Sequence, residues 1–144
     1  MSTLVEEQIL WATASSKSVT SATIAWSDAM TVDPNYWDPV LQVEADNSGT
    51  PASGDTCVVY IARSNGDIAD AAGSDDFDSD EHGEIVMQLD TYASNTPGED
   101  PARKTMPVDI GGCKSYKIGV VCAQAATRNV TVRARMGWKD GPVA

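Results

Sequence analysis

The sequence predicts an all-β fold: a single antiparallel β-sandwich or jelly-roll-like domain of about eight strands that spans residues 1–144. Alternation of apolar and polar residues with a period of two recurs along the chain, and helical periodicity does not. Stretches rich in Gly, Pro, Asn and Asp separate the alternating runs. A length of 144 residues matches one domain, and the sequence shows neither an internal repeat nor a long linker.

The individual runs place the predicted strands in order along the chain. An opening segment lies near 9–11, and the run 57–62 is apolar on both sides, as in a central strand covered on each face. Pro107 marks an edge or bulge position, because proline lacks the N–H that a ladder hydrogen bond needs. The other predicted strands are 21–26, 41–44, 85–90, 106–110, 116–123 and 129–136.

The run 129–136 has the clearest alternation. Its polar face is partly basic, since it carries Arg133 and Arg135. The apolar face consists of Val130, Val132, Ala134 and Met136. We expect Lys117 to lie on a strand next to the two arginines, so that the three cations form one partner-binding surface.

Residues 1–14 hold more apolar side chains than a free arm should expose to water. Two interpretations stay open at this point: the segment is the first strand of the sandwich, or it is an N-terminal arm that pairs with a neighbouring subunit. We favour the arm, with Trp11 as its anchor.

Composition limits the classes of protein. No apolar stretch approaches the ~20 residues that span a bilayer, and the N-terminus lacks the features of a signal peptide. Three cysteines are an odd number without clustering, so we expect reduced thiols in a cytosolic setting, with Cys57 and Cys122 buried. The net charge of -11 argues against nucleic acid as a partner. The charge is asymmetric, because the last forty-four residues are net basic.

No catalytic motif is present, and the single histidine, His82, lies in an acidic stretch at 67–84, so we expect no enzymatic activity. Asp76, Asp78 and Asp80 have the spacing that opens a calcium loop. The rest of that pattern fails, since Glu81 replaces the required glycine. We therefore expect an exterior-facing acidic loop without a cofactor, with calcium as the alternative.

Tyr36 and Trp37 lie between two prolines in a predicted loop. A rigid aromatic pair in such a loop is typical of a contact anchor or of a platform on which a sugar ring stacks. The competing interpretation is that Trp37 folds back and plugs one end of the sandwich, because exposed tryptophan is costly.

Three parts of the sequence carry a resemblance to a known family: the run 45–49 leading into 55–61, the run 107–110 before 116–120, and the ending 127–135. In these the chain resembles the small β-sandwich virion proteins of tailed bacteriophages, in particular capsid decoration (cement) proteins. The resemblance implies a non-enzymatic accessory protein that is added to the head exterior as an oligomer and stabilises the shell. It implies no catalytic residue.

The expected function is therefore that of a capsid decoration protein, assembled in the host cytoplasm and placed on the capsid exterior. Its expected partners are the major capsid protein and further copies of itself, with a trimer favoured, and neither nucleic acid nor a membrane. Alternatives are a tail or spike component and a carbohydrate-binding β-sandwich module. The expected partner-binding residues are Trp11, Tyr36, Trp37, Lys117, Arg133 and Arg135.

Overall fold

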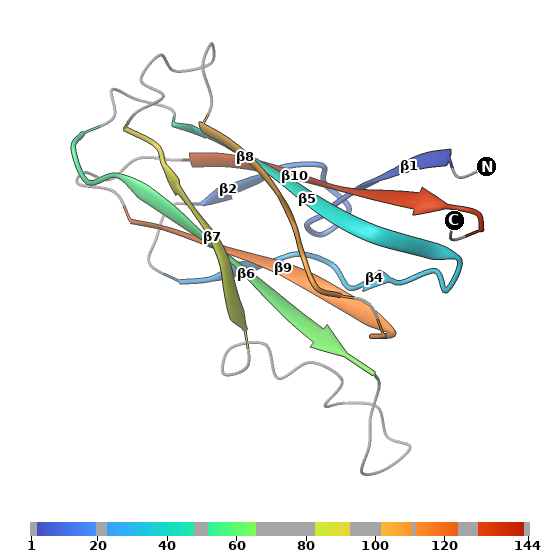
Figure 1. Cartoon of the computed structure of the whole chain (residues 1–144). Helices are drawn as coiled ribbons and strands as arrows, with labels where there is room; N and C mark the ends of the chain where they lie inside the picture. The colour runs from blue at the N-terminus through green and yellow to red at the C-terminus, as the bar shows by residue number, and fades with distance from the viewer. Residues whose placement is uncertain are drawn as a thin grey trace, which may run out of the picture.

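Two antiparallel sheets pack face to face in a computed structural model of the chain (Figure 1). The structure describes residues 3–19, 23–47, 52–65, 83–92, 102–110, 112–123 and 130–142. Ten strands and no helix are found in this part of the chain. The predicted all-β sandwich is confirmed, with ten strands in place of about eight. The two that the sequence did not predict, Lys17–Val19 and Met30–Thr31, are only three and two residues long.

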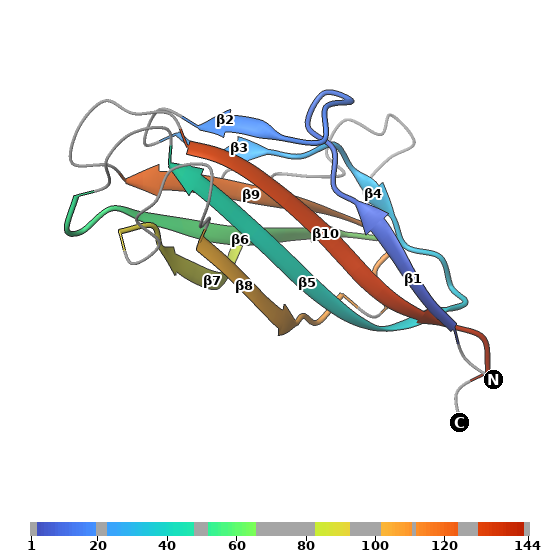
Figure 2. The ribbon, with the colours of Figure 1, turned by 90° about the horizontal axis from the view of Figure 1, so that it is seen from above.

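The first sheet, called here the β10 sheet, has the order β1-β10-β5-β8, with β2 paired to the other half of β10 (Figure 2). All its pairings are antiparallel. Its strands are β1 (Thr3–Gln8), β2 (Lys17–Val19), β5 (Tyr36–Asn47), β8 (Ala102–Pro107) and β10 (Val130–Asp140).

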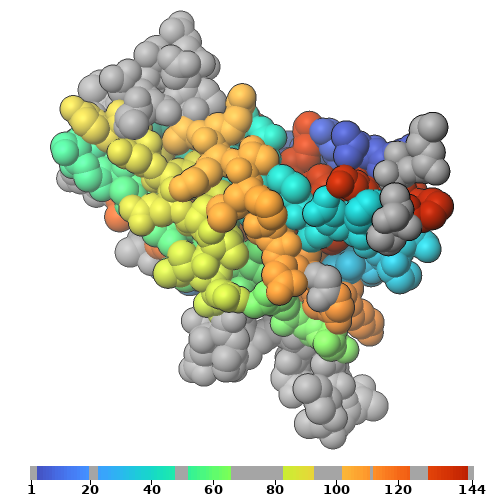
Figure 3. All heavy atoms as spheres, viewed as in Figure 1, coloured from blue at the N-terminus to red at the C-terminus, as the bar shows by residue number. Residues whose placement is uncertain are grey.

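The second sheet, called here the β9 sheet, has the order β3-β9-β6-β7, with β4 also paired to β9. Its strands are β3 (Ala25–Trp26), β4 (Met30–Thr31), β6 (Thr56–Ser64), β7 (Glu84–Asp90) and β9 (Ser115–Ala123). The edge strands β7 and β8 of the two sheets lie side by side and close one flank of the sandwich (Figure 3).

The core lies between the sheets and follows the predicted alternation. On β10 the predicted apolar face is buried and the arginines of the other face are exposed. Trp138 extends this buried face, with 1% of its surface exposed. The largest buried side chains come from both sheets: Trp138, Tyr116, Ile9, Leu41, Ile61, Ile110, Ile118 and Met136.

Several strand boundaries differ from the prediction: the opening strand is Thr3–Gln8 and not the segment near 9–11, and two further differences involve residues of the sites described below. Tyr36 and Trp37 begin β5 and do not lie in a loop. Strand β8 begins at Ala102, four residues before the predicted run. In both cases the length of the strand is set by the strands with which it pairs, since β5 pairs with β10 on one side and with β8 on the other. These partners are distant in the sequence, so local composition does not predict them.

The N-terminal segment is the first strand, and the favoured arm was wrong. Strand β1 pairs with β10 of its own chain from Thr3↔Asp140 to Gln8↔Arg135. Ile9 and Trp11 follow it and are buried in the core, so Trp11 is not a free anchor for a neighbour. Packing within one chain therefore explains Ile9 and Trp11, whereas Leu4 stays exposed on the edge strand.

A tight turn carries the chain from β1 into β2. Ala12 and Thr13 both have positive φ angles, 49° and 68°, which residues with side chains rarely adopt. The carboxylate of Asp28 accepts hydrogen bonds from both backbone N–H groups, at 2.8 and 3.0 Å. The backbone N–H of Asp28 in turn donates to the carbonyl of Leu10 at 2.7 Å. Asp28 therefore holds a turn that lacks glycine.

The expectation of reduced thiols was also wrong. Cys57 and Cys122 form a disulfide between neighbouring strands of the β9 sheet. They are 65 positions apart in sequence, so nothing in their spacing pointed to the pair. The antiparallel register of β6 and β9 places them directly opposite each other, which brings their Cα atoms to 4.0 Å. Cys113 is the free cysteine.

Candidate functional site

Arg133 and Arg135 lie on the outer face of the β10 sheet, because their neighbours Val132 and Ala134 point into the core. Strand β10 is flanked there by β1 and β5. Arg103 of β8 belongs to the same face, since it lies in register with Glu44, which lies in register with Arg133. We call this surface the arginine face and define it by Arg103, Arg133 and Arg135.

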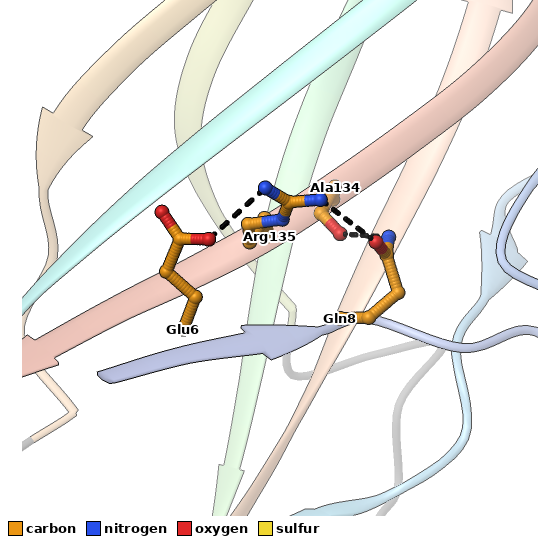
Figure 4. A network of polar contacts seen from close by, with 4 residues as sticks. All are labelled: Glu6, Gln8, Ala134 and Arg135. Atoms are coloured by element: carbon orange, nitrogen blue, oxygen red, sulfur yellow. Dashed lines mark hydrogen bonds and ion pairs between the residues drawn. The ribbon is translucent and has the colours of Figure 1, made fainter.

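Arg135 is held by β1. Its Nη1 atom donates to Oε2 of Glu6 at 3.0 Å, and its Nη2 atom lies 3.5 Å from Oε1 of Gln8 (Figure 4). The amide nitrogen of Gln8 also donates to the carbonyl oxygen of Ala134 at 2.8 Å. The guanidinium of Arg135 therefore has a fixed position and a partly neutralised charge.

Arg133 has a different environment. Glu44 is its register partner on β5, but the Glu44 carboxylate binds Arg103, with the Nε atom of Arg103 at 2.6 Å. Within the described ranges Arg133 forms no ion pair, and its side chain is exposed. A shallow hollow of about 140 Å³ lies beside it, lined by Gln8, Gln42, Glu44, Arg133, Ala134 and Arg135. Arg133 is thus an exposed cation next to a polar hollow.

Lys117 does not join the arginine face. It lies on β9, paired with Ala62 of β6, and so belongs to the other sheet. The prediction that it lies on a strand adjacent to Arg133 and Arg135 was wrong. Alternation alone assigns a residue to one face of a strand, but it does not tell which sheet the strand joins.

Tyr36 and Trp37 line a groove of about 570 Å³ at one end of the sandwich, which we call the Trp37 groove. Both are half-buried. The groove runs between the start of β5 and the segment before β9, where Cys113 and Lys114 contribute to its wall. Buried Trp138 also borders it. The two aromatic residues therefore neither project freely nor fill the core.

The Trp37 indole is fixed by contacts with the end of β10. Its Nε1 atom donates to the carbonyl oxygen of Gly141 at 3.1 Å. The ammonium of Lys139 lies 4.9 Å from the ring centroid, a cation–π contact, and 2.7 Å from a carboxylate oxygen of Asp38. Tyr36 packs on Trp138 with ring centroids 5.9 Å apart.

A bulge in β5 sets this arrangement. Trp37 pairs with Lys139 and Val40 with Gly137, so β5 has one residue more than β10 over this stretch. Asp38 lies in the bulge with a φ of 55°, and it precedes a proline. Such a backbone is unfavourable for aspartate and persists only where neighbouring contacts hold it.

Titratable groups at the groove have shifted pKa values. Desolvation, followed by the negative charges of Asp33, Asp140 and Glu7, raises the pKa of Tyr36. Desolvation also raises the pKa of the Cys113 thiol, whose Sγ atom donates to the carbonyl of Ile110 at 3.0 Å. Both groups are therefore protonated and neutral at pH 7.

The predicted acidic loop and its calcium candidates, Asp76, Asp78 and Asp80, lie outside the described residues. Among the residues that are described, no group of three or more His, Cys, Asp or Glu side chains is placed to hold a metal ion. The described part of the chain also has no helix that is long and apolar enough to cross a membrane.

Sequence reasoning missed the residues that support these sites. Glu6 and Gln8 bind Arg135 from positions more than 120 residues away. Glu7 accepts a hydrogen bond from Nε1 of Trp138 at 2.8 Å, across a similar separation. Their only signal in the sequence was the polar interruption of an apolar N-terminal segment.

No protein-family model and no curated protein matches the chain. Solved structures match it at low identity. The VP2 subviral particle of infectious bursal disease virus has 10% identity and a TM-score of 0.47, over 96% of this chain and 32% of that one. Chitosan-binding module 1 of a chitosanase/glucanase from Paenibacillus sp. IK-5 has 11% identity and a TM-score of 0.38, over 96% and 94% of the two chains.

A family GH115 4-O-methyl-α-glucuronidase, BtGH115A, matches over 92% of this chain with 10% identity and a TM-score of 0.44. The chain spans only 16% of that enzyme and about a third of VP2. These are coarse likenesses of fold to a viral capsid protein, a carbohydrate-binding module and part of an enzyme. The resemblance to decoration proteins of tailed phages stays a prediction.

Proposed function

We propose that the chain is a non-enzymatic structural protein of a bacteriophage particle, a capsid decoration protein that binds the outer head surface and stabilises the shell. The observation that carries the proposal is the arginine face. In a chain with a net charge of -11, Arg133 is exposed, has no ion pair among the described residues, and lies two positions from Arg135. A protein surface with acidic side chains would complement this face.

The distribution of charge over the protein supports attachment through one defined face. Long-range repulsion from the acidic remainder disfavours random contacts with an acidic partner, while a local arginine cluster allows contact in one orientation. Arginine suits this role because its guanidinium binds carboxylates through two parallel hydrogen bonds. The proposed partner is therefore an acidic patch on the major capsid protein.

Self-association belongs to the same proposal, with a trimer favoured. Strand β1 is an edge strand of the β10 sheet, and Leu4 on it is 83% exposed. An edge strand with an exposed leucine is a template for contact with another copy. Light scattering of the purified chain tests this: three times the chain mass of 15.2 kDa supports the trimer, and a monomer at all concentrations contradicts it.

The attachment itself is tested with heads from a phage in which the gene for this chain is deleted. Purified protein is mixed with these heads, and bound protein is measured after sedimentation. Saturable binding, with added density on the outside of the shell by electron microscopy, supports decoration. Absence of binding overturns it, and binding to tails only supports the tail or spike alternative.

A further inference from the structure

We propose that the Trp37 groove binds one ring of a neutral saccharide. This site is separate from the arginine face and does not depend on the proposed attachment to a capsid. Its volume of about 570 Å³ lies within the range of small-molecule sites. The groove faces solvent at the end of the sandwich where β5 begins, so a terminal sugar or one unit of a longer glycan can enter it.

The aromatic lining supports stacking. Tyr36 and Trp37 both line the groove, and the carbon–hydrogen face of a pyranose packs well on such rings. The indole of Trp37 is already fixed by Gly141 and Lys139, and the ring of Tyr36 by Trp138. A ligand therefore meets rings whose orientation needs no further ordering, which lowers the entropic cost of binding.

The polar lining supports a ligand with hydroxyl groups. The residues that line the groove around the aromatic pair include Asp33, Asp38, Asn65 and Lys114. This set contains both donors and acceptors, which a hydroxyl group needs because it donates and accepts at once.

The charges favour a neutral ligand over an ion. Asp38 is neutralised by Lys139 at 2.7 Å. The remaining charged side chains that line the groove, Asp33 and Lys114, have opposite signs. The lining itself therefore carries no net charge, and the nearby carboxylates of Asp140 and Glu7 disfavour an anion.

The strained backbone of the bulge also supports a ligand site at the Trp37 groove. Asp38 keeps a positive φ before a proline, and this backbone turns the chain between Trp37 and Val40. Strained conformations cluster at ligand sites, where they hold side chains in a required position. Lys139 contacts both features, since its ammonium pairs with Asp38 in the bulge and lies over the Trp37 ring.

The test is calorimetric titration of the purified full-length protein with glucose, galactose, mannose, N-acetylglucosamine and their β-1,4-linked or α-linked oligomers. We expect saturable binding of at least one of these neutral sugars in the millimolar range or tighter. Tyr36→Ala and Trp37→Ala should each weaken it about tenfold or more. Trp37→Phe keeps a ring without the N–H donor to Gly141 and should retain part of the affinity.

Tyr92→Ala is the matched control, since Tyr92 is an exposed tyrosine that follows β7 at the opposite end of the sandwich. It should bind sugar like the unmodified protein. The proposal is overturned if no sugar of the panel binds, or if Tyr36→Ala and Trp37→Ala, shown to be folded by circular dichroism, bind as well as Tyr92→Ala. Binding to capsids is measured independently, so failure here leaves the proposed function intact.

Discussion

Cys57 of β6 lies directly opposite Cys122 of β9, and their disulfide joins two central strands of one sheet. Both strands are long and form most of the inner surface of the β9 sheet. The bond therefore links segments that are 65 positions apart, near one end of the two strands, where both cysteines are buried. It restricts the unfolded chain more than it changes the folded one.

The first prediction concerns this disulfide. Closing a loop of this length stabilises a protein by about 4 kcal/mol in the chain-entropy model. The double variant Cys57→Ala/Cys122→Ala should lose a free energy of unfolding of that order in urea titrations. The control Cys113→Ala should lose little, because Cys113 is the free cysteine. Alkylation of the unfolded, unreduced protein at all three cysteines would contradict the disulfide.

The second prediction concerns alkaline pH. Tyr116 is fully buried and its hydroxyl donates to Oε2 of Glu7, so desolvation and the Glu7 charge raise its pKa far above 10.0. A raised pKa in the folded state gives stability that is present below the unfolded pKa and is lost as pH rises above it. Above about pH 10 the free energy of unfolding should fall by about 1.4 kcal/mol per pH unit from this group alone.

Tyr116→Phe isolates that contribution. The variant should be less stable at neutral pH by about 1 kcal/mol, the usual net value of a lost hydrogen bond. Its stability should then fall less steeply than that of the unmodified protein above about pH 10. Urea unfolding across this pH range is the measurement, and parallel curves for the two proteins would contradict the burial of an uncharged Tyr116.

The third prediction follows from the position of β1. Deleting residues 1–12 removes β1 and the buried side chains Ile9 and Trp11. Losing a buried tryptophan alone costs about 3–5 kcal/mol, a large part of a typical domain's stability. The truncated chain should lose its native circular dichroism signal, while Leu4→Lys should leave stability within about 0.5 kcal/mol. A truncated chain that stays folded and only loses self-association would restore the arm interpretation.

The fourth prediction concerns Gly119 in the middle of β9. A Cβ atom there would lie 2.7 Å from the Trp26 ring and 2.8 Å from Ile24, so the ring must move. Gly119→Ala should destabilise the protein by about 1–3 kcal/mol, as overpacking does. Gly137→Ala is the control, because its Cβ would be 3.7 Å from the carbonyl of Val40, an ordinary contact. Equal effects in thermal melts would contradict the packing of Trp26 on Gly119.

The sequence predicted the fold class because alternation is a local property. The inward and outward residues of β10 follow from its pattern alone, and so does the central position of β6. Pairing partners are not local. Whether residues 1–14 form a strand or an arm, whether Cys57 meets Cys122, and which sheet carries Lys117 all depend on register between distant strands.

In the candidate sites, too, the features set by local alternation were predictable and those set by contacts between distant strands were not. The exposure of Arg133 and Arg135 was predictable from their positions between apolar residues. The contacts that distinguish the two arginines were not, because Glu6 and Gln8 reach Arg135 through the β1–β10 pairing and Glu44 is bound by Arg103. The Trp37 groove depends on a bulge and on residues from β5, β10 and the segment before β9.

The affinity of charge-reversal variants for undecorated heads tests the central claim most directly. Arg133→Glu breaks no ion pair among the described residues, so the variant should fold normally. It should bind the heads about tenfold more weakly or worse, because a reversed charge at a contact repels the partner. Arg133→Glu/Arg135→Glu should abolish binding. The control Lys17→Glu/Lys104→Glu changes the net charge of -11 by the same four units. Both lysines lie off the arginine face, because Lys17 is in register with Val132 and Lys104 with Val43, which point into the core. We expect only the arginine variants to lose binding; an equal loss in the control, or no loss in any variant, would contradict attachment through the arginine face.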